Sequence, residues 1–282
     1  FYHHTWWEQY KLFNDYVTRM GYLLTGGNHV AKVAILYPMN TIWSNFTPQK
    51  RDKIGNVVEN DFTYMTDRLL RLHVDFDYLD EDVMKQCEIR NGKLMLPPCT
   101  HIQKSTMDIL ERFYAAGGKI GGDALLPYRF VDSGREDYGT PELAARVKAI
   151  FGRDPVELRE SFLASDENGT SLEIHENGAG GKAAFIAGQG IEREDALGVL
   201  REAVLACVTP EIEISSDEVF YLHRVKDGRD FFFLCNPVEK GGRVHISLEG
   251  EWRPELWNLE TGAVEPLFVY RVQNGKTSFE LD

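Results

Sequence analysis

The stretch of residues 31–38 constrains the fold of this chain more than any other. It reads Ala-Lys-Val-Ala-Ile-Leu-Tyr-Pro, which is short, almost entirely apolar and closed by a proline. A strand that is apolar at consecutive positions is buried on both faces, and such strands belong to parallel sheets flanked by helices. The stretch therefore predicts the first strand of a doubly wound α/β domain, and a ligand crevice is expected at its carboxyl end, after Pro38.

The segment before this strand has the pattern of an amphipathic helix. Apolar residues recur at three- and four-residue spacing between Trp6 and Leu24, and two glycines at residues 26–27 end the pattern. Trp7 and Tyr16 widen the apolar face beyond what one neighbour would cover. We therefore expect this helix to pack on more than one partner.

Downstream of the strand, helix-period segments alternate with short apolar strands. This order predicts a mostly parallel sheet of the flavodoxin or class I amidotransferase type. Residues 39–59 are expected to form a long polar loop, with Asn60 as the cap of the next helix. Residues 89–96 are typical of a hairpin, and Ser105 with Asp108 resembles a helix capping box.

The pattern changes after residue 209. Short strands then follow one another with Gly-containing turns and without a helical period. Such a series is typical of an antiparallel β-sandwich. We therefore place a domain boundary near Pro210, with a β-sandwich over residues 210–282.

Charge and composition argue against two classes of partner. The chain has 31 Lys and Arg against 44 Asp and Glu, a net charge of −13, and no basic run, so no nucleic acid partner is expected. No apolar run approaches the roughly 18 residues needed to span a bilayer, so no membrane partner is expected either. The four cysteines lack metal-ligand spacing, which predicts free thiols and no bound metal. Nothing in the composition indicates a cellular compartment.

A thiol nucleophile is the first catalytic candidate to consider. Doubly wound amidotransferases place one at a strand-to-helix elbow, where small residues must surround the cysteine, as in G-x-C-x-G. Cys99 instead follows Pro97 and Pro98. We therefore expect a degenerate domain in which Cys99 has no catalytic role.

A flavin or dinucleotide site is the second candidate. It would need a glycine-rich or Ser/Thr-rich phosphate cradle directly after the strand at residues 31–38. Residues 39–43, Met-Asn-Thr-Ile-Trp, contain no glycine. No cofactor is therefore expected.

Three groups of side chains are candidates for binding a ligand. Two aspartates alternate along a predicted strand as paired carboxylates, although a strand end with a solvated turn also explains them. Histidines beside tryptophans near the N-terminus suit a sugar pocket, but a packed helix start explains them equally well. The segment after Pro38 places a stacking ring and an amide at the expected crevice. The candidates are Asp75, Asp77, His3, His4, Trp7, Trp43 and Asn45.

Several runs of residues match one kind of multidomain protein. The first places Arg19, Leu23, Leu24 and Gly26 in an Arg-x-x-x-Leu-Leu-x-x-Gly-like spacing. The others are His-Val-Asp-Phe-Asp-Tyr-Leu-Asp, Ala-Ala-Gly-Gly-Lys-Ile, Phe-Leu-Cys-Asn-Pro and Leu-Trp-Asn-Leu-Glu-Thr-Gly, at residues 73–80, 115–120, 233–237 and 256–262. Together they resemble part of the large glycoside hydrolases of the α-L-rhamnosidase type, and more loosely β-galactosidase-type enzymes with an amidotransferase-like middle domain. The last run departs from the usual Trp-Asp-Pro-x-Thr-Gly-like turn, because Asn258 and Leu259 stand at the positions of its Asp and Pro.

This resemblance implies a domain arrangement and a function. Residues 1–28 would be the last helix of a preceding catalytic (β/α)8 barrel, residues 29–209 an amidotransferase-like domain, and residues 210–282 an accessory β-sandwich. The catalytic carboxylates of the family would lie on barrel strands before Phe1, so no catalytic residue is expected here. The chain would then be a non-catalytic C-terminal portion of an α-L-rhamnosidase-like hydrolase, which meets its carbohydrate through the parent protein. The alternative is a stand-alone α/β interaction module that forms a homo-oligomer without sugar chemistry.

Overall fold

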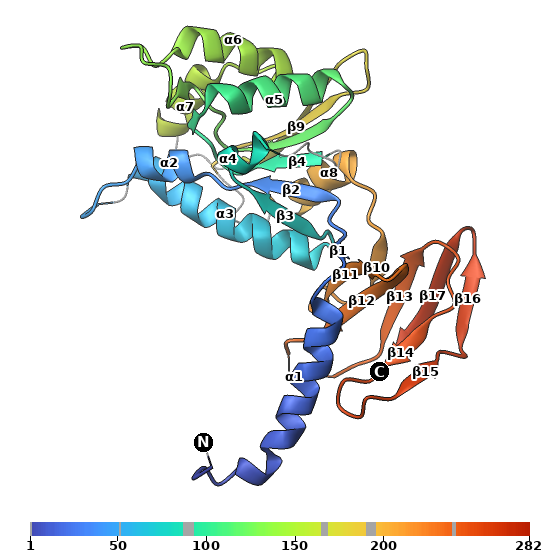
Figure 1. Ribbon diagram of the computed structural model, residues 1–282. Helices are drawn as coiled ribbons and strands as arrows, with labels where there is room; N and C mark the ends of the chain where they lie inside the picture. The colour runs from blue at the N-terminus through green and yellow to red at the C-terminus, as the bar shows by residue number, and fades with distance from the viewer. Residues whose placement is uncertain (1, 51, 87–92, 165–168, 190–195, 239–240) are drawn as a thin grey trace. The chain divides into compact units, whose positions relative to one another are not determined.

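The computed structural model describes residues 2–50, 52–86, 93–164, 169–189, 196–238 and 241–282 (Figure 1). The chain divides into two compact units. The α/β unit is Ala31–Pro210, and the β unit joins Phe1–Val30 to Glu211–Asp282.

The α/β unit is built on a mainly parallel sheet of order β3-β2-β4-β6-β9-β8, in which only β8 runs antiparallel to its neighbour. Its strands are β2 (Val33–Leu36), β3 (Phe76–Leu79), β4 (Lys93–Leu96), β6 (Lys119–Asp123), β8 (Ser171–Glu176) and β9 (Lys182–Ala187). Two short strands, β5 (His101–Ile102) and β7 (Arg129–Phe130), pair separately. The helices are α2 (Met39–Ser44), α3 (Lys53–Arg71), α4 (Glu81–Met84), α5 (Lys104–Ala115), α6 (Thr140–Phe151), α7 (Pro155–Ala164) and α8 (Ala196–Cys207). The prediction of a mostly parallel sheet around residues 31–38 is confirmed.

Each face of this sheet packs on helices. Val33 and Ile35 of β2 belong to an apolar cluster that contains side chains of α3 and α8. Ala34 and Leu36 belong to a second cluster with side chains of α5 and α6. These four residues are at most 2% exposed. An uninterrupted apolar strand is what a position covered on both faces requires.

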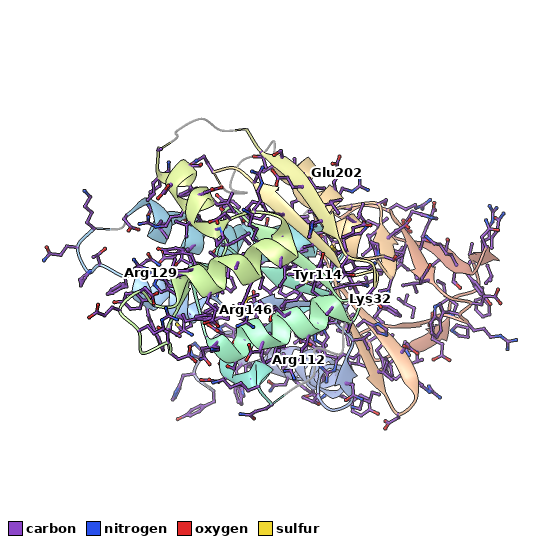
Figure 2. The ribbon with its side chains drawn as sticks, turned by 90° about the horizontal axis from the view of Figure 1, so that it is seen from above. Lys32, Arg112, Tyr114, Arg129, Arg146 and Glu202 are labelled. Atoms are coloured by element: carbon purple, nitrogen blue, oxygen red, sulfur yellow. The ribbon has the colours of Figure 1, made fainter. Side chains whose placement is uncertain are left out.

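An ion pair joins the two helices α5 and α6; Figure 2 labels Arg146, its residue on α6. The Arg146 guanidinium of α6 donates to both carboxylate oxygens of Glu111, at 2.8 and 2.7 Å, and to Asp108 at 2.6 Å. These carboxylates raise the pKa of Arg146, although its partial burial opposes the rise. Bidentate pairs of this kind add geometric specificity to helix packing.

The prediction of a long loop over residues 39–59 is wrong. Helix α2 begins at Met39, directly after β2, and α3 begins at Lys53. The cap of α3 is Asp52, whose carboxylate accepts a hydrogen bond from the Gly55 amide at 2.7 Å, and not Asn60. The apolar period visible from Phe62 onward covers only the second half of this helix, so the predicted start of the helix was too late in the sequence.

Two other local predictions are also corrected. Residues 93–96 do not form one arm of a hairpin, because β4 lies between β2 and β6 and is parallel to both; residues 89–92 lie outside the described part of the chain. Helix α5 begins at Lys104 without a side-chain cap. The amides of Gln103 and Lys104 are bonded instead by Glu81 and Asp132, at 2.6 and 3.0 Å. Carboxylates distant in sequence thus replace the expected capping box.

The β unit contains only antiparallel pairs of strands among its described residues. Its sheets have the orders β1-β11-β12, β10-β13-β17-β16 and β14-β15. The strands are β1 (Asn28–His29), β10 (Ile212–Ile214), β11 (Phe220–Lys226), β12 (Arg229–Cys235), β13 (Val244–Glu249), β14 (Glu255–Trp257), β15 (Val264–Pro266), β16 (Tyr270–Gln273) and β17 (Lys276–Leu281). The antiparallel strands expected after residue 209 are confirmed. Side chains of both larger sheets, among them Tyr221 and Ile246, share one apolar cluster.

The N-terminal segment is part of the β unit. It holds a short 3-10 turn, η1 (Trp7–Gln9), then α1 (Tyr10–Leu24) and β1, which pairs with β11. Arg19 of α1 donates to the carbonyl oxygens of Leu259 and Glu260 at 2.8 and 2.6 Å. Asn258 shapes this turn, since its side-chain oxygen accepts from the amides of Glu260 and Thr261, both at 2.9 Å. The Asn258 side chain thus makes the hydrogen bonds that hold this turn.

Candidate functional site

The carboxyl end of the parallel sheet carries a buried polar network. Thr41 of α2 is fully buried, and its hydroxyl accepts hydrogen bonds from the amides of Thr100 and His101 at 3.0 and 3.1 Å. The same hydroxyl lies 3.4 Å from the Cys99 sulfur. The His101 ring is 2.9 Å from the Thr100 hydroxyl. This network ties α2 to the segment that follows β4.

Cys99 lies in this network without the features of a nucleophile. It is 2% exposed, and burial raises the pKa of its thiol to about 12. Burial and the charge of Arg129 lower the pKa of His101 to about 4, so the imidazole next to it is neutral. A reactive cysteine needs a lowered pKa and access to solvent. The thiol therefore remains protonated near neutral pH and acts as a packing group.

Glu81 holds the same edge of the sheet together. Its two carboxylate oxygens accept from the Asn40 side chain at 2.7 Å and from the Gln103 amide at 2.6 Å. Burial raises the pKa of Glu81 despite these hydrogen bonds. The residue joins the starts of α2, α4 and α5, so its role in the described structure is structural.

A second carboxyl pair lies at the end of β6. Asp123 is fully buried, as is Asp61 of α3. Burial, together with the charge and the hydrogen bond of Asp61, raises the pKa of Asp123 well above its usual range. Two carboxyl groups in this position cannot both ionise cheaply. The next residue, Ala124, has a φ of 49°, which is a strained conformation for a side chain other than glycine.

The candidate residues of the α/β unit lie in two places. Trp43 of α2 is 69% exposed, and Asn45 follows that helix and donates to the Thr41 carbonyl at 2.8 Å and the Thr100 hydroxyl at 3.0 Å. Both follow the carboxyl end of β2. Asp75 precedes β3, is 7% exposed and accepts from the Phe76 amide at 2.9 Å. Because β2 and β3 are parallel, Asp75 lies at the amino end of these strands, whereas Trp43 follows their carboxyl end. Asp77 lies on β3.

The three N-terminal candidates lie in the β unit at the start of α1. His4 stacks on Trp6 with ring centroids 5.0 Å apart, and Trp7 stacks on Tyr10 at 5.6 Å. His3 contacts the Tyr2 ring at 3.8 Å. Trp6 and Trp7 remain 46% and 44% exposed. These rings form a chain of aromatic contacts on an open helix surface, and their role in ligand binding stays a prediction.

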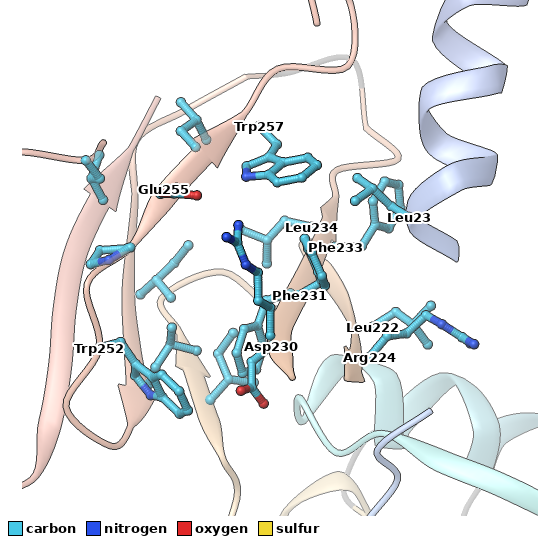
Figure 3. Close-up of a pocket in the computed structure, with 18 of the residues that line it drawn as sticks. Leu23, Leu222, Arg224, Asp230, Phe231, Phe233, Leu234, Trp252, Glu255 and Trp257 are labelled. Atoms are coloured by element: carbon cyan, nitrogen blue, oxygen red, sulfur yellow. The ribbon is translucent and has the colours of Figure 1, made fainter. Parts of the chain in front are cut away.

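The β unit also contains a cavity that the sequence did not indicate (Figure 3). It has a volume of about 650 Å³ and is lined by β12, by the segment of residues 252–257 and by the last turn of α1. Figure 3 shows Trp257, Phe231 and Phe233 around it, with Leu23 of α1. Trp257 meets the Phe231 ring edge to face, with centroids 5.3 Å apart. The signal that could have found this site is the run Trp-Arg-Pro-Glu-Leu-Trp, which places two tryptophans around two opposite charges.

Asp230, which also lines the cavity, is held by a buried histidine. The two ring nitrogens of His223 lie 3.1 Å from Glu211 and 2.9 Å from Asp230. The ring stacks on Phe232 at 4.2 Å. Burial alone would lower the pKa of His223, but the hydrogen bonds to the two carboxylates and their charges raise it. The imidazole, held between two carboxylates, fixes the orientation of Asp230.

The described residues contain free thiols and no cluster of side chains suited to a metal ion. Cys99, Cys207 and Cys235 are free thiols, and Cys87 lies outside this part of the chain. Three or more His, Cys, Asp or Glu side chains do not gather around a common cation position anywhere in the described ranges. None of the described helices combines the length and apolar content needed to cross a bilayer.

Known proteins similar to this chain are glycoside hydrolases. The chain is 22% identical over 293 aligned residues to a Formosa agariphila protein named "Putative beta-glucuronidase". The alignment covers 98% of this chain and 20% of that protein. In fold it is similar to the rhamnosidase from Novosphingobium sp. PP1Y, with a TM-score of 0.56 and 19% identity over 98% of this chain and 24% of the enzyme. It is also similar to a β-galactosidase from Bacillus circulans sp. alkalophilus, with a TM-score of 0.58 and 14% identity over 94% of this chain and 43% of the enzyme.

The chain spans about a fifth to a quarter of the length of the first two of these proteins. The expected resemblance to the α-L-rhamnosidase type is confirmed by a family model that matches residues 1–272 and is described as glycoside hydrolase 106, alpha-L-rhamnosidase. This chain belongs to that family.

Proposed function

We propose that this chain is a non-catalytic, C-terminal portion of a carbohydrate-active hydrolase and that it supports the catalytic domain of that protein. Membership of a glycoside hydrolase family over residues 1–272 supports a carbohydrate substrate for the whole protein. Rhamnosides come first as substrates because of the family's description, and glucuronides come second because of the name of the Formosa relative.

The observation that carries the supporting role is the exposed apolar face of η1 and α1. Trp7 and Phe13 are 44% and 59% exposed, and Leu12 is 70% exposed. Only Leu23 of α1 is buried. Contiguous exposed apolar surface of this kind marks an interaction site. The partner we propose is the catalytic barrel of the same protein, with α1 as its last helix.

The α/β unit is proposed to be a doubly wound, amidotransferase-like scaffold without thiol chemistry. The order β3-β2-β4-β6-β9 corresponds to the order 2-1-3-4-5 of flavodoxin-like sheets when these strands are numbered along the chain. The raised pKa of Cys99, which results from its burial, supports the loss of the nucleophile. The shared core of the two larger β sheets supports a sandwich arrangement after Pro210.

We expect no hydrolysis by this chain alone, because glycosidases need a particular arrangement of two carboxyl groups. Two carboxyl groups must face one bond from opposite sides, about 5 Å apart for retention and roughly 6.5–9.5 Å apart for inversion. Asp75 directly precedes the edge strand β3 and Asp77 lies on it, and Asp61 and Asp123 are closed off from solvent. Neither pair offers an open site between two carboxylates.

The test compares this chain with a longer gene product that contains it. Aryl α-L-rhamnosides and aryl β-D-glucuronides should be hydrolysed by the longer protein and not by the chain alone. Phe13→Asp in the longer protein should lower its activity and melting temperature, whereas Phe268→Asp, at a residue that is 85% exposed in the β unit, should change neither. Turnover that purifies with the chain alone would contradict the proposal.

Self-association is the second function that the exposed face of α1 supports. A stable dimer of the longer protein, broken by Phe13→Asp while its hydrolytic activity stays unchanged, would favour the oligomerisation module. The expected result is a longer protein whose oligomeric state does not respond to this substitution. Analytical ultracentrifugation separates the two results.

A further inference from the structure

The cavity of the β unit has the dimensions of a small-molecule site. Its volume of about 650 Å³ lies within the roughly 300–1,000 Å³ of ligand pockets. Strand β12, the segment of residues 252–257 and the end of α1 contribute to its wall. All three belong to one compact unit, so the cavity is a property of that unit.

Two tryptophan rings in this wall are held in place by other residues. The Trp252 indole donates to the Glu249 carbonyl at 2.6 Å, and its amide donates to the Thr277 hydroxyl at 2.8 Å. Trp257 meets Phe231 edge to face. Trp252 is 36% exposed, and Trp257 is half-buried. Rigid, partly exposed aromatic rings provide apolar surface at little entropic cost, which suits the apolar face of a sugar ring.

Charged side chains of both signs stand beside these rings. Arg253 and Glu255 line the cavity and are exposed, and neither side chain has a hydrogen bond or ion pair with another residue in the described ranges. Asp230, oriented by His223, supplies a further acceptor. The cavity therefore offers the N–H donors of the Arg253 guanidinium and the carboxylates of Glu255 and Asp230 next to aromatic surface.

This combination selects among ligand classes. An apolar ligand could contact the rings but would form no hydrogen bonds with the exposed side chains of Arg253 and Glu255. An anion would meet Glu255 and Asp230. Hydroxyl groups both donate and accept, so a neutral polyhydroxylated ring satisfies both signs of charge while one of its faces lies on an indole.

We propose that the cavity binds a neutral saccharide unit, as a non-catalytic carbohydrate site of the β unit. The proposal rests on the proposed function, because a carbohydrate-active protein is where such a ligand is met. Trp257 provides the stacking surface, and Arg253, Glu255 and Asp230 bind the hydroxyls. The site retains carbohydrate next to the enzyme and takes no part in bond cleavage.

The experiment is a titration of the 282-residue chain with methyl α-L-rhamnopyranoside and methyl β-D-galactopyranoside, followed by saturation-transfer NMR and calorimetry. At least one glycoside should bind saturably with a Kd in the millimolar range. Trp257→Ala should weaken this binding about tenfold or more, since ring stacking is lost. Arg253→Gln and Glu255→Gln should each weaken it by about three- to tenfold, as expected for one lost charged hydrogen-bond partner.

Two matched substitutions in the same unit serve as controls. Phe268→Ala removes a ring that is 85% exposed, and Arg271→Gln removes an exposed guanidinium of β16; neither residue lines the cavity, and binding should stay within about twofold. If Trp257→Ala fails to fold, the binding measured with Arg253→Gln and Glu255→Gln decides the result. Binding that none of the cavity variants weakens would overturn the proposal, as would no saturable binding of either glycoside at 50 mM, a concentration of about ten times a weak Kd. Hydrolysis by the longer protein is measured separately, so its loss would count against the proposed function and not against this site.

Discussion

Replacing Gly262 tests how α1 is fastened to the β unit. Gly262 has a φ of 77°, and a Cβ there would lie 2.9 Å from Nε and 3.1 Å from Cζ of Arg19. Gly262→Ala thus has two costs. The left-handed backbone costs about 1 kcal/mol for a residue with a Cβ. The side chain also displaces Arg19 from the carbonyls of Leu259 and Glu260, and this partly exposed pair of hydrogen bonds is worth about 1 kcal/mol.

The expected loss in the free energy of unfolding of the β unit is therefore about 2 kcal/mol. Gly275→Ala is the matched control, because Gly275 has a φ of 73° and no atom within 4 Å of the added Cβ. It should cost only the backbone term of about 1 kcal/mol. Arg19→Met should cost about 1 kcal/mol, and the Gly262→Ala/Arg19→Met double variant about 2 rather than 3 kcal/mol, because the clash is absent once the guanidinium is removed.

Urea denaturation followed by tryptophan fluorescence measures these losses. Four of the five tryptophans belong to the β unit, so a Trp43→Phe background confines the signal to it. A loss of 2 kcal/mol should lower the urea midpoint by about 1 M. The reasoning is refuted if Gly262→Ala costs no more than Gly275→Ala, or if the double variant loses the sum of the two single losses.

Three further predictions concern buried titratable groups. Hydrogen bonds to two carboxylates outweigh burial and raise the pKa of His223, so the stabilisation by its positive charge is fully present below a pH of about 6.5 and is lost as the pH rises through the raised pKa. The urea midpoint of the β unit should therefore fall with rising pH in the native chain and stay level in His223→Gln. An equal slope in both proteins would contradict this. Burial raises the pKa of Cys99 to about 12, so a thiol reagent at pH 8 should label the exposed Cys235 in the folded chain and Cys99 only after unfolding, as mapped by mass spectrometry; rapid labelling of folded Cys99 would restore it as a candidate nucleophile. Burial and the charge of Asp61 raise the pKa of Asp123, so the free energy of unfolding decreases as the pH rises from about 4 toward that pKa. Asp123→Asn should therefore raise the melting temperature at pH 7, with little gain at pH 4. A lower melting temperature of this variant at pH 7 would show that the carboxyl group is required.

The sequence alone determined those features that depend on local patterns. The uninterrupted apolar run of β2 predicted a parallel sheet, because burial on two faces excludes the alternation of a half-exposed strand. Alternating strands and glycine-containing turns after residue 209 predicted the antiparallel pairs. Family membership was also predicted from short runs of residues, such as the spacing of Arg19 with Gly26, and the family match over residues 1–272 confirmed it.

Only the tertiary structure decided which segments meet. The pairing partner of β4 is chosen by strands distant in sequence, so a run that is typical of a hairpin lies parallel between β2 and β6. The start of α5 is bonded by Glu81 and Asp132, which no local capping pattern includes. Likewise, Arg19 meets a turn 240 residues away, and the cavity beside Trp257 is assembled from the end of α1 and from several strands and loops that are distant from it in sequence. Hydrogen-bond partners and cavity walls are set by the packing of the whole chain, whereas burial leaves its period in the local sequence.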